Sequence, residues 1–171
     1  MSELALRLTV FLGLFVLLAA LETLLPRRER SMARRGRWIT NWGMTLANTL
    51  TLRLMAVLLP VLAVGAAVDA ERLGIGLFNV TDWPLWLEWM LALLVLDLLI
   101  WTQHMLTHKI PFLWRLHRVH HADRDMDVTT AIRFHPVEIG LSMLLKIGAV
   151  YLLGPAMGAV ILFEILLNGC A

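Results

Sequence analysis

The residues of this chain best suited to chemistry are its histidines, and all six lie between His104 and His135. Five of them form two groups, H-x-x-x-H and then H-x-x-H-H, namely His104, His108, His117, His120 and His121. Neutral imidazole is the commonest nitrogen ligand of metal ions in proteins. Residues three or four apart share one face of a helix, so each group directs its rings to one place. The pattern predicts a metal centre built from histidines.

The number of imidazoles indicates what kind of centre this is. Five convergent rings exceed the four ligands of a closed zinc site and the two histidines of the facial triad. Two metal ions sharing a larger histidine set are the natural alternative. A metalloprotease would need the glutamate of H-E-x-x-H, which the segment 104–108 lacks. A carrier of metal ions is disfavoured because the histidines lie outside the apolar segments rather than near the middle of a span.

The composition is that of a membrane protein. Of the 171 residues 59% are hydrophobic and 16% are charged, with a mean hydropathy of +0.74, whereas soluble domains are nearer half apolar and a quarter charged. The lone cysteine, Cys170, excludes an intramolecular disulfide and a zinc motif with several cysteines. The segment 27–37 holds six of the 15 lysines and arginines. Beside a hydrophobic span, this run indicates a cytoplasmic loop rather than a nucleic-acid site.

Apolar runs long enough to cross a bilayer divide the chain. We expect spans over 4–25, 44–68 and 85–102, and then either one kinked span or a hairpin of two short helices over 137–168. The expected fold is an all-α integral membrane bundle of about four spans with a cytosolic His-rich helical segment. Its parts are 1–103, transmembrane helices with a basic cytosolic loop at 26–37; 104–136, the cytosolic metal segment; and 137–171, a further membrane segment. Counts of lysine and arginine in the short loops place the histidines on the cytoplasmic side.

Several polar residues outside the two groups have more than one interpretation. Asp97 lies on the same helical face as His104, about two turns earlier. It would accept a hydrogen bond from a ligand imidazole, or pair with another residue within the bundle. His135, which precedes Pro136, would bind metal, orient the site or form a hydrogen bond at the membrane interface. Glu164 and Asn168 lie in an apolar run, where they would contact substrate or pair within the bundle. The acidic turn 123–127 is expected to be solvated.

Three motifs in order now resemble a known family. They are Asp97-x3-Trp101-x2-His104-x3-His108, Leu113-Trp114-x2-His117-x2-His120-His121 and Arg133-x-His135-Pro136-x-Glu138. Together they resemble the fatty acid hydroxylase/sterol desaturase superfamily, whose members are histidine-rich di-iron oxygenases of membranes. The resemblance implies a helical membrane bundle capped by a cytosolic helical domain. It also implies that the five histidines of the two groups are iron ligands.

The resemblance further implies the cofactors and partners. Two iron ions, cycling between Fe2+ and Fe3+, would use dioxygen and external electrons to hydroxylate or desaturate a fatty acid, sterol, carotenoid or other membrane lipid; zinc would substitute for iron. A ferredoxin, cytochrome or reductase would supply the electrons, and no nucleic acid is expected. Basic residues near Arg115 and Arg118 would contact an acidic donor or anionic lipid headgroups.

The sequence departs from the family pattern after Asn168. The family has a further His-rich stretch after the membrane segment that follows R-x-H-P, and here the sequence ends at Ala171. We therefore expect a fragment that resembles the N-terminal part of such an enzyme, or an incomplete gene model. The alternative function is a non-redox metal-binding membrane protein, or an inactive fragment lacking the last histidine group.

Overall fold

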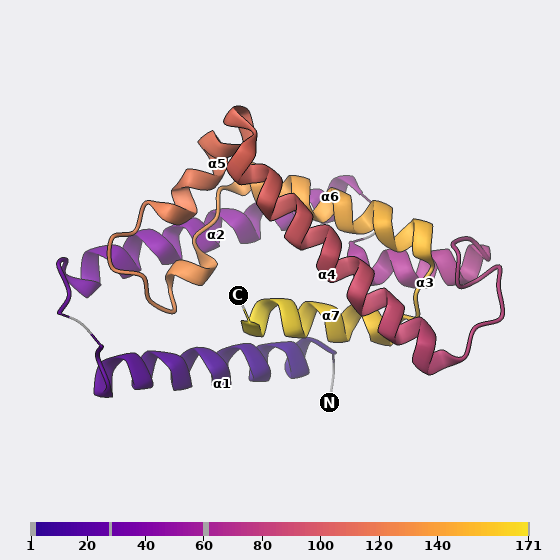
Figure 1. Cartoon of the computed structure of the whole chain (residues 1–171), viewed down its shortest axis with the longest axis horizontal. Coiled ribbons are helices and arrows are strands. Elements are labelled where there is room, and N and C mark those ends of the chain that lie inside the picture. The colour runs from indigo at the N-terminus through magenta and orange to yellow at the C-terminus, as the bar shows by residue number, and fades with distance from the viewer. Residues whose placement is uncertain (1–2, 28, 60–61, 171) are drawn as a thin grey trace.

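The computed structural model describes residues 3–27, 29–59 and 62–170, and throughout these ranges the regular structure is helical (Figure 1). The elements are α1 (Glu3–Leu24), α2 (Arg34–Leu58), α3 (Ala63–Leu73), α4 (Leu85–Lys109), α5 (Pro111–His121), the 3-10 turn η1 (Thr130–Ile132), α6 (Pro136–Leu153) and α7 (Met157–Cys170). The described ranges contain no strand. The prediction of an all-α fold is confirmed.

Four helical stretches are long and apolar enough to cross a membrane, in the part of the chain that the structure describes. They are Ala5–Leu24, Leu85–Lys109, Pro136–Leu153 and the stretch Arg34–Leu73, of which the structure describes the two helices α2 and α3. Their outer faces expose large aliphatic side chains, such as Val57 at 83% and Leu152 at 78% of full exposure. A water-soluble protein of this size would not expose so much contiguous apolar surface. These faces are suited to contact with lipid, as the expected bundle of about four spans requires.

The apolar stretch that we expect to form the second span is divided between two helices. α2 begins at Arg34, well before Met44, and ends at Leu58; α3 follows from Ala63. Leu59 has an extended backbone, with φ −108° and ψ 130°. It precedes a proline in the sequence, and a residue in that position disfavours the α conformation. The position of the proline in the sequence indicates this helix break, which the length of the apolar stretch alone does not predict.

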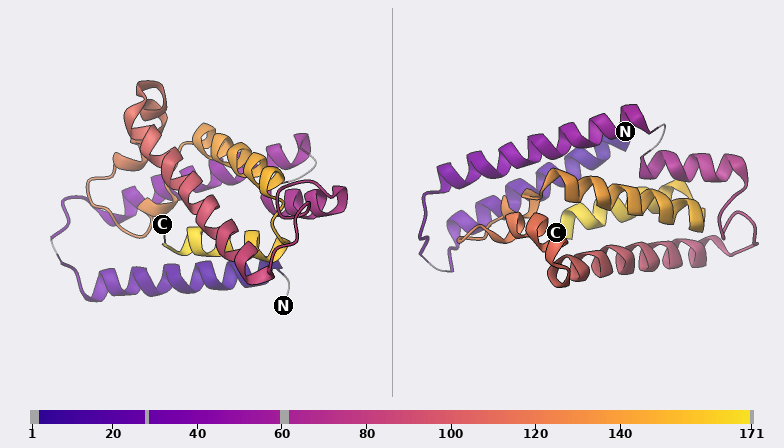
Figure 2. Two further views of the ribbon diagram at one scale, coloured as in Figure 1. Left: turned by 45° about the vertical axis from the view of Figure 1, so that its right-hand side comes forward. Right: turned by 90° about the horizontal axis from the view of Figure 1, so that it is seen from above.

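The C-terminal apolar stretch forms two helices, which decides between the two alternatives for 137–168. α6 ends at Gly154, whose φ of 63° lies in the left-handed region that closes many helices. The chain then turns, and α7 runs back between α4 and α1 (Figure 1). α6 itself lies between α4 and the pair α2–α3, as the view from above shows (Figure 2). In this central position, the first turn of α6 lies next to the histidine segment.

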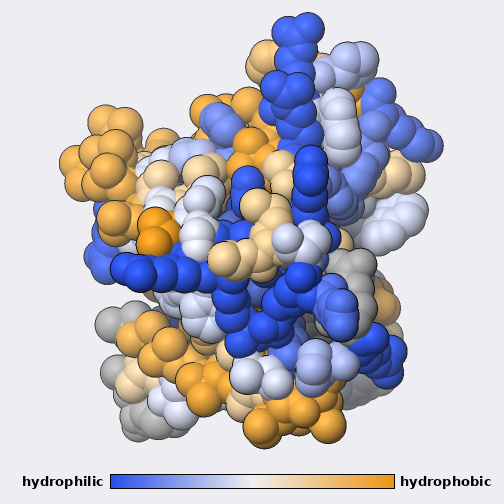
Figure 3. Space-filling view, turned by 90° about the vertical axis from the view of Figure 1, so that its left-hand side faces the viewer, coloured by the Kyte–Doolittle hydropathy of each residue, from blue (hydrophilic) through white to orange (hydrophobic). Residues whose placement is uncertain are grey.

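The polar segments gather at one end of the molecule. The loop before α2 and the loop after α5 meet there, and hydrophilic side chains cover much of that face (Figure 3). Asp125 accepts hydrogen bonds from the backbone N–H groups of Ser31 and Met32. The arginine-rich loop and the histidine segment therefore share one end of the bundle, as the expected topology requires.

The acidic turn is buried rather than solvated, so our expectation for 123–127 is wrong. The guanidinium of Arg37 binds Asp123, with Nη2 to Oδ2 at 3.0 Å, and it also pairs with Asp127 at 3.1 Å. Asn41 donates to the same Asp123 oxygen. Burial would raise the pKa of Asp123, but the bonds from Arg37 and Asn41 hold that pKa below its ordinary value. The sequence alone does not indicate this burial, because the arginine that pairs with these aspartates lies more than eighty residues away.

Replacement of Arg37 by Ala should therefore destabilise the fold. Removing one partner of a buried ion pair leaves an uncompensated charge and costs about 3–5 kcal/mol. We expect a clear fall in the midpoint of thermal unfolding in detergent. The matched control is Arg35→Ala, because Arg35 is exposed on the same helix turn. Equal midpoints for the two variants would contradict a structural role for Arg37.

Candidate metal centre

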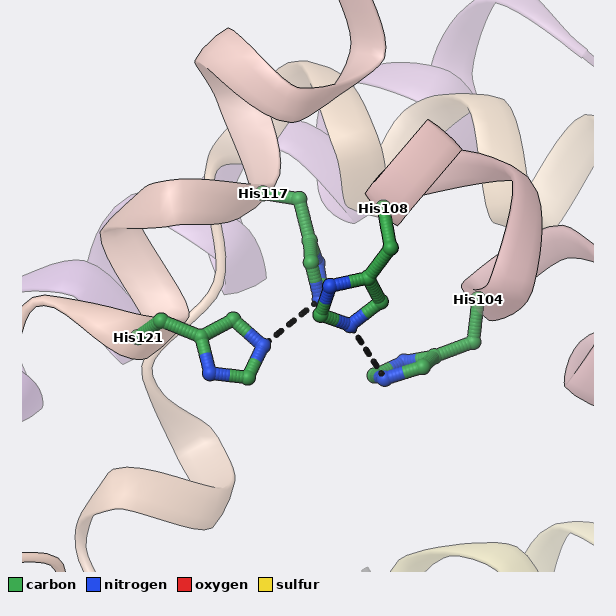
Figure 4. Close-up of side chains that lie close together, drawn as sticks. All are labelled: His104, His108, His117 and His121. Atoms are coloured by element: carbon green, nitrogen blue, oxygen red, sulfur yellow. Dashed lines mark hydrogen bonds between the residues drawn. The ribbon is translucent and has the colours of Figure 1, made fainter. Parts of the chain in front are cut away.

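Two helix ends bring the histidine groups together. His104 and His108 occupy the last turns of α4, and the chain then turns at Ile110, whose backbone is extended. Pro111 begins α5 and places His117 and His121 over the end of α4. Figure 4 shows these four rings converging from the two helices. Pro111 produces this corner, because the residue before a proline disfavours the α conformation and α4 therefore ends at Lys109.

The four rings are close enough to share ligands. One nitrogen from each ring can be chosen so that all four lie within 4.8 Å of one another. His104 Nε2 is 3.2 Å from His108 Nε2, and His121 Nε2 is 3.2 Å from His117 Nε2 (Figure 4). Two nitrogens bound to one metal ion at about 2.1 Å lie roughly 3.0–3.4 Å apart. The spacing of the nitrogens therefore fits a shared metal ion.

His117 is held by a carboxylate from the next membrane helix. Its ring is fully buried, and Nδ1 lies 2.6 Å from Oε1 of Glu138 in the first turn of α6. This hydrogen bond fixes the tautomer in which Nδ1 carries the proton, so Nε2 keeps a lone pair for a metal. The sequence suggested Asp97 for a role of this kind. Glu138 belongs to the third sequence motif, but its partner could not be predicted from the sequence.

His120 lies beside the four rings rather than among them. Its ring stacks on Phe134 at 4.6 Å between centroids, with an interplanar angle of 7°. Its centroid is 5.0 Å from that of His121 and 6.4 Å from that of His104. Nδ1 of His120 is buried and has no hydrogen-bond partner among the described residues. The structure thus gathers four of the five predicted ligands and places the fifth at their edge with a free nitrogen.

The pKa values of His117 and His120 lie below the ordinary value for histidine. Burial and, after it, the neighbouring imidazoles His121 and His108 lower the pKa of His117 to about 4. Burial and the charges of His121 and His117 lower the pKa of His120 to about 4 as well. A metal ion binds the neutral imidazole, so these rings need not lose a proton at neutral pH. Clustered imidazoles with one orienting carboxylate are a donor set that fits iron or zinc.

The remaining predicted site residues lie elsewhere. His135 caps α6, because its Nδ1 accepts from the N–H of Val137 at 3.2 Å. It thereby fixes the start of the helix that carries Glu138. Asp97 is exposed on the outer face of α4, and no hydrogen bond or ion pair is recorded for it within the described residues. Neither residue contacts the four-ring cluster in that part of the chain.

Glu164 and Asn168 belong to the packing of the membrane helices. Glu164 is buried and pairs with Lys146 of α6, Nζ to Oε1 at 3.0 Å, and with Arg7 of α1. The side chain of Asn168 donates to the backbone carbonyl of Glu164 at 2.7 Å. These contacts join α1, α6 and α7 away from the histidines. They support the bundle interpretation over a substrate contact.

An apolar groove leads from the membrane helices to the histidines. It has a volume of about 550 Å³ and lies between α4 and α6, with residues of α5 above it. Aliphatic side chains make most of its wall, and Gln103, Thr107 and Glu138 make its polar end. Thr107 lies between the two histidines of α4, and Glu138 binds His117. The groove therefore opens beside the candidate metal centre.

Residues 89–170 match the family model described as fatty acid hydroxylase. This part of the chain is similar to a fatty acid hydroxylase domain. The matched region contains both histidine groups, Glu138 and the whole wall of the groove. No solved structure matches the chain. The match suggests oxidoreductase chemistry in general, while the geometry above identifies the side chains available for it.

Glu138→Ala should weaken metal binding to the four-ring cluster. A hydrogen-bonding partner of a ligand histidine typically contributes tenfold to a hundredfold in metal affinity. Glu138→Gln should lose less, since the amide oxygen still accepts from His117 Nδ1. Equilibrium dialysis of the purified protein against Fe2+ under argon measures both. Glu71→Ala, at an exposed position on α3, is the matched control. Equal iron affinity in Glu138→Ala and the control would contradict the orienting role.

Proposed function

We propose that this chain is a membrane-bound non-haem di-iron oxygenase that hydroxylates or desaturates a C–H bond of a lipid. The observation that carries the proposal is the convergence of four imidazoles beside the polar end of an apolar groove. A fatty acid, sterol or carotenoid has the apolar surface that such a groove binds. The family match supports the same class of chemistry.

The protein's own residues bind and orient rather than react. His104, His108, His117 and His121 would hold the ions, with His120 as a fifth donor at the edge. Glu138 keeps the proton of His117 on Nδ1, so that Nε2 faces the centre. The aliphatic wall of the groove excludes water from the bound chain. Iron, when bound, supplies the activation of dioxygen that no amino-acid side chain provides.

The overall reactions fix the co-reactants. Hydroxylation consumes one dioxygen, two electrons and two protons, and it gives the alcohol and one water. Desaturation consumes the same reagents, removes two hydrogens from adjacent carbons and gives two waters. Each therefore needs a reductant, which we propose is a ferredoxin, cytochrome or reductase. Lys109, Arg115 and Arg118 are exposed near the histidines and supply positive charge for an acidic donor. We propose that this end faces the cytoplasm, as the arginine-rich loop beside it favours.

A non-redox metal-binding protein is the second candidate. Four nitrogens within 4.8 Å also suit one closed tetrahedral zinc site. The two candidates differ in their use of dioxygen, because a closed zinc site has no electron to give. Dioxygen consumption therefore separates them.

The test uses the full chain in nanodiscs with Fe2+, a ferredoxin–reductase pair and a mixture of fatty acids and sterols. We expect dioxygen consumption that depends on the reductant, and a lipid that gains one oxygen atom or loses two hydrogens by mass spectrometry. His108→Ala should abolish both signals, whereas Glu71→Ala, at an exposed position on α3, should retain both. Stoichiometric metal binding without reductant-dependent dioxygen consumption would overturn the oxygenase and favour the zinc protein.

A further inference from the structure

The groove between α4 and α6 is polar at one end and apolar along the rest. Gln103, Thr107 and Glu138 lie at the histidine end, and the other nine lining residues are aliphatic or glycine. On α6 the lining extends from Glu138 to Leu152, which is about 21 Å at 1.5 Å per residue. The hydrocarbon core of a bilayer is about 30 Å thick. The groove is therefore shorter than the hydrocarbon core. Its length and its single polar end suit an extended alkyl chain that carries one polar group.

The polar end holds two acceptors that lack a donor. Oε2 of Glu138 and Oε1 of Gln103 are buried and have no hydrogen-bond partner among the described residues. Glu138 is 7% exposed overall, and its other oxygen already binds His117. The hydroxyl of Thr107 donates to the carbonyl of His104, so it too has only accepting capacity left. Buried acceptors without donors are costly, and a ligand group that donates hydrogen bonds would satisfy them.

We propose that the groove binds a single-chain lipid with its head toward the histidines. The head group carries at least one O–H or N–H donor, which bonds Oε1 of Gln103; a head with a second donor hydrogen, such as a primary amide, also bonds Oε2 of Glu138. The alkyl tail follows α6 toward Leu152. The inference rests on the proposed function and adds an orientation to it. The C–H bond that lies beside the histidine cluster is then near the head group, and the terminal carbons of the tail lie far from it. This chain would oxidise the head-proximal part of its lipid.

Gly148 is the residue that leaves room for the tail. It lines the groove on α6, and a Cβ added there would meet no atom within 4 Å. A leucine at 148 would therefore fit the fold and enter the groove. Gly43 of α2 is the matched control, because its surroundings are equally open and it does not line the groove. Both substitutions exchange a helical glycine for leucine, so their effects on helix propensity are alike.

The test is photolabelling of the full chain in phosphatidylcholine nanodiscs without metal or reductant. The probe is hexadecanol with a diazirine at its last carbon. We expect label on the segment 148–152, competed by hexadecanol at least tenfold better than by hexadecane. Gly148→Leu should reduce that label at least tenfold, and Gly43→Leu should leave it unchanged. Gln103→Leu should weaken competition by hexadecanol about tenfold, because one hydrogen bond to the head is lost.

Label from the terminal carbon near Gln103 and Glu138 would show the reverse orientation and overturn the proposal. Equal competition by hexadecane, or equal labelling of Gly148→Leu and Gly43→Leu, would also overturn it. Because the experiment needs no iron, its outcome is independent of the oxygenase assay. A chain that labels as expected but consumes no dioxygen would refute the proposed function. The proposed lipid orientation, with the head toward the histidines, would still hold.

Discussion

The hydrogen bond between His117 and Glu138 connects the two parts of the protein on which the candidate site depends. One partner lies on the short helix α5, at the polar end of the bundle, and the other on the first turn of a membrane helix. Both are buried, so the bond forms away from competing water and is correspondingly strong. It sets the tautomer of His117 and joins α5 to α6. It also places the second oxygen of Glu138 at the end of the groove.

The surrounding elements can be understood as supports for that bond. His135 caps α6 and so fixes the start of the helix whose first turn carries Glu138. On the other side, the loop after α5 is held by Arg37, which binds Asp123 and Asp127. Two long membrane helices thereby restrain both ends of the histidine segment. A metal site needs this rigidity, because ligand nitrogens must be held near their binding positions before the ion arrives.

Much of the architecture was predictable from the sequence because the signals are local. Apolar length predicts the spans, Pro111 predicts the corner between α4 and α5, and the spacing of the histidines predicts shared faces. The glycine–proline pair at Gly154 also indicated a break, although sequence could not choose between a kink and two helices. The start of α2 was missed because its first turns are polar and contain arginine, which hydropathy does not register as helix.

The failures concern partners far apart in the chain. Asp97 has the correct helical phase for a role beside His104, yet Glu138 of another helix fills that kind of role for His117. The aspartates of 123–127 look solvated until Arg37 is brought to them by the packing of α2. Glu164 finds its cations on α1 and α6. Spacing reports which residues share a face, but tertiary packing decides what that face meets.

The most direct test of the account is the metal content of the purified chain after anaerobic loading with iron, compared with that of His117→Ala. The account predicts iron bound in stoichiometric amount, with nitrogen ligands in the X-ray absorption spectrum. It also predicts at least a tenfold loss of bound iron in His117→Ala, while membrane insertion is unchanged. Equal iron content in the two proteins, or iron without nitrogen ligands, would contradict the claim that the converging imidazoles form a metal centre.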